Sequence, residues 1–129
     1  MQRILVVEDS PTMRALLTAS LEEISSQIKV TEAANGFEAL RALPRDSFDL
    51  IVTDINMPDI NGLELLSFVK SNPAYESIPL VIVSTERSER DLARGVSLGA
   101  DAYVVKPFDP EELRAIVGEL LERSNASEG

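Results

Sequence analysis

The 129-residue sequence contains no cysteine, no histidine and no tryptophan. Without cysteine it has neither a disulfide bond nor a thiolate metal site, which fits a cytoplasmic location. Without histidine it has no imidazole to serve as a base, a metal ligand or a phosphoryl carrier. Any phosphohistidine chemistry would therefore have to come from a partner.

Long apolar runs and excess basic charge are also missing. No run approaches the ~20 apolar residues that span a bilayer, and residues 1–8 lack the pattern of a secretion signal. The formal net charge is −10. Because a nucleic-acid backbone requires a basic partner surface, this charge argues against direct nucleic-acid binding. We therefore expect no membrane insertion and no direct contact with nucleic acid.

Five short apolar runs alternate with segments of helical periodicity. The runs are Ile4–Val7, Ile28–Thr31, Leu50–Thr53, Leu80–Val83 and Ala102–Val105. Short Val, Ile and Leu runs between helices are typical of a parallel sheet buried on both faces. The second run is the most polar, so we expect an edge strand there. The pattern predicts one doubly wound five-stranded α/β domain over residues 1–123, followed by a disordered polar tail at 124–129.

The helical segments carry their own start signals. Ser10 is a predicted N-cap, and Asn61 with Glu64 matches a capping box. A fourth helix is predicted to start at Ser88 or Asp91. The first helix is predicted to bury one apolar stripe, made of Met13, Leu16, Leu17, Leu21 and Ile24.

Polar side chains with reactive groups follow four of the five predicted strands. Glu8 and Asp9 follow the first, Asp54 the third, Ser84 the fourth and Lys106 the fifth. Carboxyl ends of parallel strands meet at one edge of the sheet, so we expect these residues to converge. Three carboxylates there would repel by about 4 kcal/mol per pair at ~4 Å. Oxygen ligands without histidine or cysteine then favour a bound Mg²⁺ or Mn²⁺.

This arrangement suits phosphoryl transfer. A metal held by Asp9 and Asp54 would neutralise and orient an incoming phosphoryl group. Asp54 is then the candidate nucleophile, forming an aspartyl phosphate, while Lys106 and Ser84 would each bind a phosphoryl oxygen. Taken singly, each residue is better explained as a cap, a turn or a strand exit. The prediction depends on their joint placement.

Several motifs together indicate a family. They are VVEDSPTMR (6–14), DINMP (54–58) with NGLELL (61–66), IPL (78–80) up to Ser84, GADAY (99–103) and VVKPF (104–108). In combination the sequence resembles the receiver domain of bacterial two-component response regulators, and within that family the stand-alone chemotaxis regulators. The resemblance spans residues 1 to about 123. It implies a flavodoxin-like (βα)5 fold with strand order 2-1-3-4-5.

The resemblance also implies roles at the predicted site. Asp54 would accept a phosphoryl group from a histidine kinase or a phosphotransfer protein. The Mg²⁺ ligands would be Asp9, Asp54, the backbone carbonyl of Asn56 and, directly or through water, Glu8. Lys106 would pair with the phosphoryl group and precede a cis bond to Pro107.

A switch and its tuning residues are implied in the same way. The Ser84 hydroxyl would move toward the phosphoryl group while the Tyr103 ring turns inward. This change would remodel the surface of the fourth helix, fifth strand and fifth helix, where an output protein docks. Asn56 and Glu86 would tune the access of hydrolytic water. The implied protein is a phospho-acceptor rather than an enzyme.

Three residues depart from the family pattern. Glu8 stands where aspartate is frequent, Ser84 where threonine is commoner, and Thr85 where a small alanine is frequent. None of these changes removes the nucleophile, the lysine or the second acid. We therefore expect an active receiver.

Three rival interpretations stay open. A haloacid-dehalogenase-type phosphatase would need a second aspartate two residues after Asp54, where Asn56 stands. A flavodoxin-like cofactor binder would need a glycine-rich phosphate loop after the first strand. A pseudo-receiver that binds partners without phosphorylation is motivated by Glu8.

Overall fold

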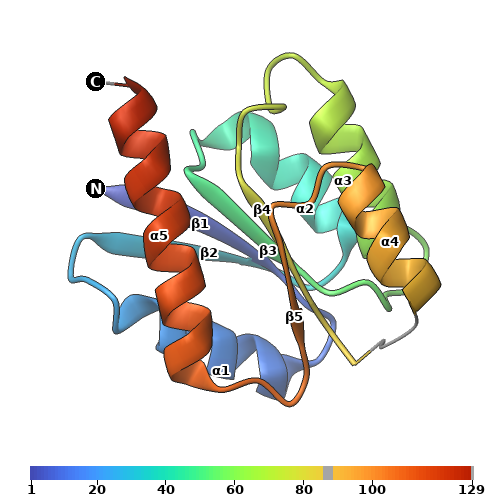
Figure 1. Cartoon of the computed structure of the whole chain (residues 1–129), viewed down its shortest axis with the longest axis horizontal. Coiled ribbons are helices and arrows are strands. Elements are labelled where there is room, and N and C mark those ends of the chain that lie inside the picture. The colour runs from blue at the N-terminus through green and yellow to red at the C-terminus, as the bar shows by residue number, and fades with distance from the viewer. Residues whose placement is uncertain (86–88, 129) are drawn as a thin grey trace.

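The structure is a computed structural model that describes residues 1–85 and 89–128. Its single sheet contains the strands β1 (Gln2–Val7), β2 (Ile28–Ala33), β3 (Leu50–Thr53), β4 (Leu80–Ser84) and β5 (Ala102–Val105). All neighbouring strands are parallel, in the order β2-β1-β3-β4-β5 (Figure 1). The predicted fold class, strand order and edge position of the second strand are confirmed.

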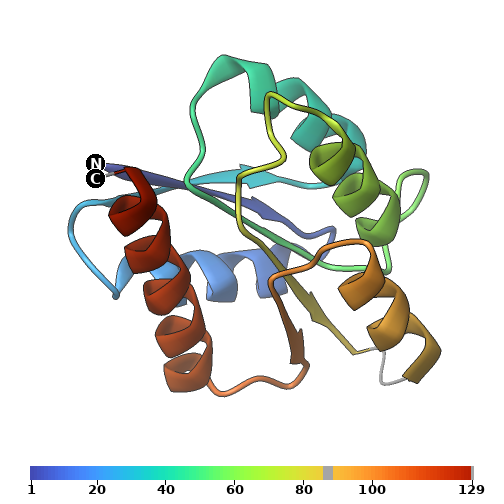
Figure 2. The same cartoon turned by 45° about the horizontal axis from the view of Figure 1, so that its top comes forward.

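Helices cover both faces of the sheet. They are α1 (Pro11–Glu22), α2 (Gly36–Ala42), α3 (Gly62–Ser71), α4 (Glu89–Ser97) and α5 (Pro110–Glu128), with a 3₁₀ turn η1 (Leu43–Arg45) after α2. Helices α1 and α5 lie on one face, and α2, α3 and α4 lie on the other (Figure 2). The apolar side chains form two cores, one on each side, as expected for a sheet buried on both faces.

The predicted helix starts are mostly found. The Ser10 hydroxyl accepts a hydrogen bond from the backbone N–H of Met13. Asn61 and Glu64 form the complete capping box at the start of α3. Helix α4 begins at Glu89, two residues before Asp91, and Ser88 lies outside the described residues.

One member of the predicted apolar stripe of α1 differs from the prediction. Leu16 is 46% exposed, whereas Leu17 and Leu21 are buried. One residue turns a helix by about 100°, so Leu16 lies on the flank of α1 once Leu17 faces the sheet. Helix α5 continues to Glu128 and therefore includes residues 124–128 of the predicted tail. The domain boundary at residue 123 stays a prediction.

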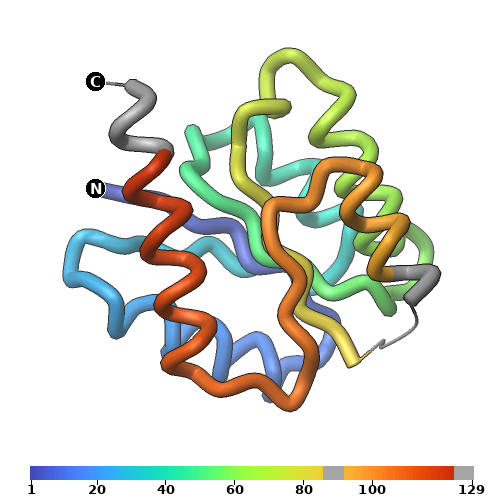
Figure 3. Tube along the Cα trace, viewed as in Figure 1, coloured from blue at the N-terminus to red at the C-terminus, as the bar shows by residue number. Residues whose placement is uncertain are grey.

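The strand register sets up the site. Val7 of β1 is the partner of Thr53 in β3, so the residues that follow these strands leave the sheet together. The trace in Figure 3 shows β1 and β3 side by side in the middle of the sheet. Ser84 is likewise the partner of Val105. A lysine after β5 must reach past the end of β4 to meet the acids.

Candidate functional site

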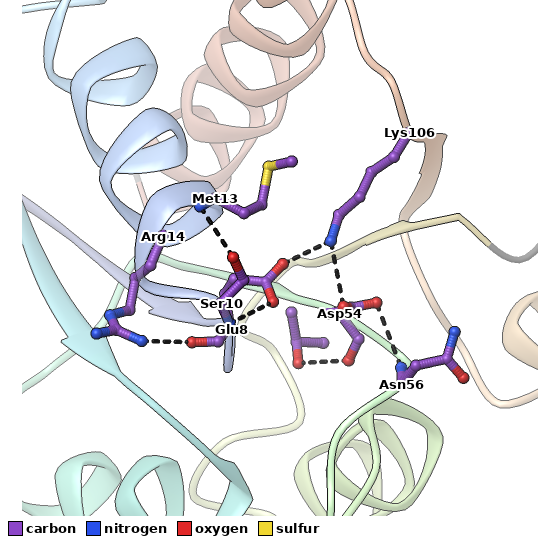
Figure 4. Close-up of polar contacts among 8 residues, drawn as sticks. Glu8, Ser10, Met13, Arg14, Asp54, Asn56 and Lys106 are labelled. Atoms are coloured by element: carbon purple, nitrogen blue, oxygen red, sulfur yellow. Dashed lines mark hydrogen bonds and ion pairs between the residues drawn. The ribbon is translucent and has the colours of Figure 1, made fainter.

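Three carboxylates and one ammonium meet at the carboxyl edge of the sheet. Oxygen atoms of Glu8, Asp9 and Asp54 all lie within 4.8 Å of one another. The Lys106 Nζ is 2.6 Å from Glu8 Oε1 and 3.2 Å from Asp54 Oδ2 (Figure 4). The structure therefore brings together the three acids and the lysine of the set predicted from the strand ends.

Most of this cluster is buried. Glu8 is 1%, Asp54 7% and Lys106 9% exposed, whereas Asp9 is exposed and faces solvent. If ionised, the three carboxylates outnumber the single ammonium by two charges. Charges in such surroundings are costly unless they are paired. The cluster is therefore arranged to receive further positive charge from the side on which Asp9 is open.

The backbone around Asp54 is held on all sides. Its N–H donates to the Val7 carbonyl at 3.1 Å, and the Thr53 hydroxyl donates to its carbonyl at 3.0 Å. The N–H of Asn56, whose side chain is exposed, donates to Asp54 Oδ1 at 3.3 Å. A Cβ on Gly62 would lie 2.1 Å from the Asp54 carbonyl oxygen, so only glycine permits this close approach.

Glu8 is held at both its backbone and its side chain. The Ser10 N–H donates to Glu8 Oε2 at 3.1 Å, while the other carboxylate oxygen meets Lys106. The guanidinium of Arg14 donates to the Glu8 carbonyl at 2.8 Å and to Glu32 Oε1 at 3.0 Å. Glu8 therefore has defined partners before any metal or phosphoryl group arrives.

Burial and charge shift two pKa values in this cluster. The pKa of Glu8 is raised above its ordinary value, mainly because burial penalises the carboxylate, and further by neighbouring Asp9 and Asp54. The contact with Lys106 opposes that rise. Burial would lower the pKa of Lys106, but the hydrogen bond to Glu8 and the charge of Asp54 outweigh it and raise that pKa.

The predicted switch residues lie along β4 and β5. Ser84 is buried at the end of β4, and its carbonyl accepts a hydrogen bond from the Lys106 N–H at 2.8 Å. The peptide bond between Lys106 and Pro107 is cis. Tyr103 is partly buried and packs against the core on the α2–α3–α4 side. Glu86 lies outside the described residues.

The residues present fit a magnesium ion. All three clustered side chains offer hard carboxylate oxygens, and their mutual repulsion is relieved by a divalent cation. Glu8, Asp9 and Asp54 would hold the ion. The chain has neither cysteine nor histidine, so it offers no thiolate or imidazole ligand to a competing metal.

Sequence reasoning missed three supporting residues: Arg14, Thr53 and Gly62. Arg14 pairs with Glu32, 18 positions away, and nothing in the helical pattern of α1 indicates that pairing. Gly62 looks like ordinary turn punctuation after Asn61. Its position at the first residue of α3, directly after the loop that follows the acceptor, is the signal that could have suggested a close backbone contact.

Comparison with known proteins identifies the class. The family described as "Response regulator receiver domain" matches residues 4–118. A chemotaxis protein CheY homolog of Campylobacter jejuni is 35% identical over 120 residues, covering 92% of either chain. The response regulator Rre1 of Synechocystis is 38% identical over 96% of this chain, which spans only 53% of that relative's length.

Solved structures agree with these sequence relatives. Chemotaxis protein CheY4 of Vibrio cholerae superposes with a TM-score of 0.84 at 32% identity, over 93% of this chain and 98% of that one. A CheY-like receiver domain of Methanospirillum hungatei gives a TM-score of 0.89 at 29% identity over 100% and 99% of the two chains.

The chain belongs to the response regulator receiver domain family. It is a signalling protein of the CheY-like kind rather than an enzyme in the ordinary sense. The acidic pocket of Glu8, Asp9 and Asp54 is consistent with the magnesium site of such domains. Among the described residues, no helix has both the length and the apolar character of a membrane span.

Proposed function

We propose that this chain is a phospho-acceptor that receives a phosphoryl group on Asp54 and signals by binding a protein. The observation that carries the proposal is the placement of Lys106 Nζ within 3.2 Å of Asp54 Oδ2, beside two further acids. The donor is the phosphohistidine of a histidine kinase or phosphotransfer protein, since this chain has no histidine.

The transfer forms one bond and breaks another. An Asp54 carboxylate oxygen attacks phosphorus, the O–P bond forms, and the N–P bond of the donor imidazole breaks. The Lys106 ammonium then moves from its carboxylate partners toward a phosphoryl oxygen, and the Ser84 hydroxyl donates to another. Bound Mg²⁺ supplies charge neutralisation of the phosphoryl oxygens. Glu8, Asp9, Asp54 and the Asn56 carbonyl would hold it.

The output is a change of surface. In the proposal Tyr103 turns inward as Ser84 moves, which alters the face formed by α4, β5 and α5. The partly buried position of Tyr103 next to α4 supports this role: a Cβ on Gly95 would already lie 3.7 Å from the ring atom Cδ2. Asn56, exposed beside the acceptor, is proposed with Glu86 to tune hydrolysis.

The pathway is proposed from the relatives. Those that match nearly end to end include a chemotaxis protein CheY homolog and chemotaxis protein CheY1 of Helicobacter pylori, which is 34% identical over 113 residues. We propose a role in chemotaxis or motility on this basis. The proposal includes a cytoplasmic location, which the cysteine-free composition permits.

Phosphorylation of wild type and of Asp54→Asn tests the proposal. With a small phosphodonor such as acetyl phosphate and Mg²⁺, wild type should gain the mass of one phosphoryl group by intact-protein mass spectrometry. Asp54→Asn should gain none, and a chelator should abolish the reaction in wild type. Labelling that persists in Asp54→Asn would refute the acceptor. Absence of labelling in wild type would favour a pseudo-receiver.

A further inference from the structure

We propose that Arg14 is a positioning residue for the metal site, acting on the backbone of Glu8 and anchored by Glu32 of β2. The inference rests on the proposed function, because it presupposes that Glu8, Asp9 and Asp54 hold a divalent cation. It concerns a residue that contacts neither the acceptor nor the lysine in the described hydrogen bonds. It also extends the site from the carboxyl edge of the sheet to its outer strand.

The guanidinium of Arg14 forms a bridge between two elements. Its Nη1–H donates to the carbonyl oxygen of Glu8 at 2.8 Å (Figure 4). Its Nε–H donates to Glu32 Oε1 at 3.0 Å, and the Arg14 side chain is 20% exposed. Both N–H groups belong to one rigid planar group, so fixing one contact orients the other. The Glu8 N–H is held by β2 as well, through the Ala33 carbonyl at 3.0 Å.

The bridged carbonyl belongs to the peptide between two of the three acids. Glu8 and Asp9 lie on either side of that peptide, so its rotation changes the direction in which both side chains leave the backbone. Glu8 has further anchors in Lys106 and the Ser10 N–H. Asp9 is exposed, so the direction of its carboxylate depends more on the backbone. Holding the Glu8 carbonyl therefore keeps the Asp9 carboxylate within reach of the other two acids.

Position rather than charge should dominate this effect. The Arg14 charge is paired with Glu32, which cancels much of its field at the acids. Lysine at this position would keep the charge but lose the planar fork that reaches both partners. The variants Arg14→Ala and Arg14→Lys therefore separate the two explanations. Arg114 of α5 offers a matched control, because its guanidinium pairs with Glu23, the C-cap residue of α1, at the same 3.0 Å.

The test measures the Mg²⁺ dissociation constant of the unphosphorylated protein by isothermal titration calorimetry. Loss of groups that orient metal ligands typically weakens binding by 10- to 100-fold, so we expect about a tenfold loss in both Arg14→Ala and Arg14→Lys. Arg114→Ala should bind as wild type does. In metal-free NMR spectra, the amide signals of Glu8 and Asp9 should shift in the two Arg14 variants and not in Arg114→Ala.

Each other outcome has a defined meaning. An unchanged Mg²⁺ dissociation constant in folded Arg14→Ala would overturn the proposal. Full Mg²⁺ affinity in Arg14→Lys would also overturn it, because the charge of residue 14 would then be enough to explain its effect. An equal loss in Arg114→Ala would show a general effect of instability. If Arg14→Ala does not fold, Glu32→Ala keeps the arginine, and the proposal requires a smaller but measurable loss there. Wild type that binds no Mg²⁺ would refute the proposed function itself.

Discussion

Two lysines lie at opposite edges of the sheet, each beside carboxylates. At the carboxyl edge, Lys106 contacts Glu8 and Asp54, with Asp9 close by. At the amino edge, Lys70 pairs with Asp101 at 3.2 Å and also donates to the Ile78 carbonyl at 2.8 Å. Both places combine a lysine with acidic side chains. They differ in the number of carboxylates around the lysine and in how deeply the charged groups are buried.

The difference separates a structural pair from a binding site. Asp101 Oδ2 accepts hydrogen bonds from both Lys70 and the Leu80 N–H, so one lysine meets one carboxylate and the geometry is complete. Lys106 alone faces three acids and leaves negative charge in excess. A one-to-one pair ties elements together. An unbalanced buried cluster has stored repulsion that a metal ion and a phosphoryl group can relieve.

The largest expected difference in stability is between alanine substitutions of two glycines, Gly62 at the carboxyl edge of the sheet and Gly99 at the amino edge. Gly62→Ala should destabilise the fold by about 4 kcal/mol, because the new Cβ would lie 2.1 Å from the Asp54 carbonyl and the backbone must move. Gly99 lies beside Lys70 with φ +102°, where alanine is strained without such a clash. Gly99→Ala should cost about 1–2 kcal/mol. Urea denaturation measures the unfolding free energy of both variants. Equal losses of stability would contradict the special requirement for glycine beside the Asp54 carbonyl.

The second contrast removes each lysine. Lys106→Ala leaves two buried carboxylates without their cation and should cost about 3 kcal/mol at neutral pH. Lys70→Ala removes a partly exposed pair and should cost about 1 kcal/mol. Mg²⁺ should stabilise Lys106→Ala more than it stabilises wild type or Lys70→Ala, because in that variant the ion also replaces the missing charge. Urea denaturation of each variant with and without Mg²⁺ measures these differences. A larger loss of stability in Lys70→Ala than in Lys106→Ala would contradict the distinction between the structural pair and the binding site.

The smallest contrast concerns pH. Glu8 has a pKa raised above its ordinary 4.5, so the folded state holds this proton more tightly than the unfolded state does. Its contribution to the unfolding free energy therefore falls as pH rises from 4.5 to the raised pKa, by at most about 1.4 kcal/mol per pH unit. Glu8→Gln should lack this slope. A constant stability difference between wild type and Glu8→Gln across that pH range would contradict the raised pKa of Glu8.

Lys106 gives the matching test at alkaline pH. Its pKa is raised above 10.5, so its stabilising contribution is complete below pH 10.5 and is lost as pH rises through the raised pKa. Lys106→Ala should show no such loss. The pH dependence of the urea denaturation midpoint of wild type and of Lys106→Ala measures this difference.

Local patterns were enough to predict much of this fold. The five apolar runs became the five strands, and Ser10 and Asn61 cap their helices as expected, because capping depends on contacts within one turn. The prediction that Leu16 is buried is wrong, since neighbouring leucines on a helix compete for one buried stripe and only packing decides between them. The bridge from Arg14 to Glu32 depends on where β2 lies, which no local pattern encodes.

The sequence by itself determined which chemical groups are available and that they stand directly after strands: three carboxylates, a hydroxyl and a lysine, with no histidine or cysteine. Only the tertiary structure decided that Lys106 lies between Glu8 and Asp54, 98 and 52 positions away. The physical reason is that strand order and register set distances at the edge of the sheet. The charge excess of the cluster, on which its proposed chemistry depends, arises only when those strands are brought together.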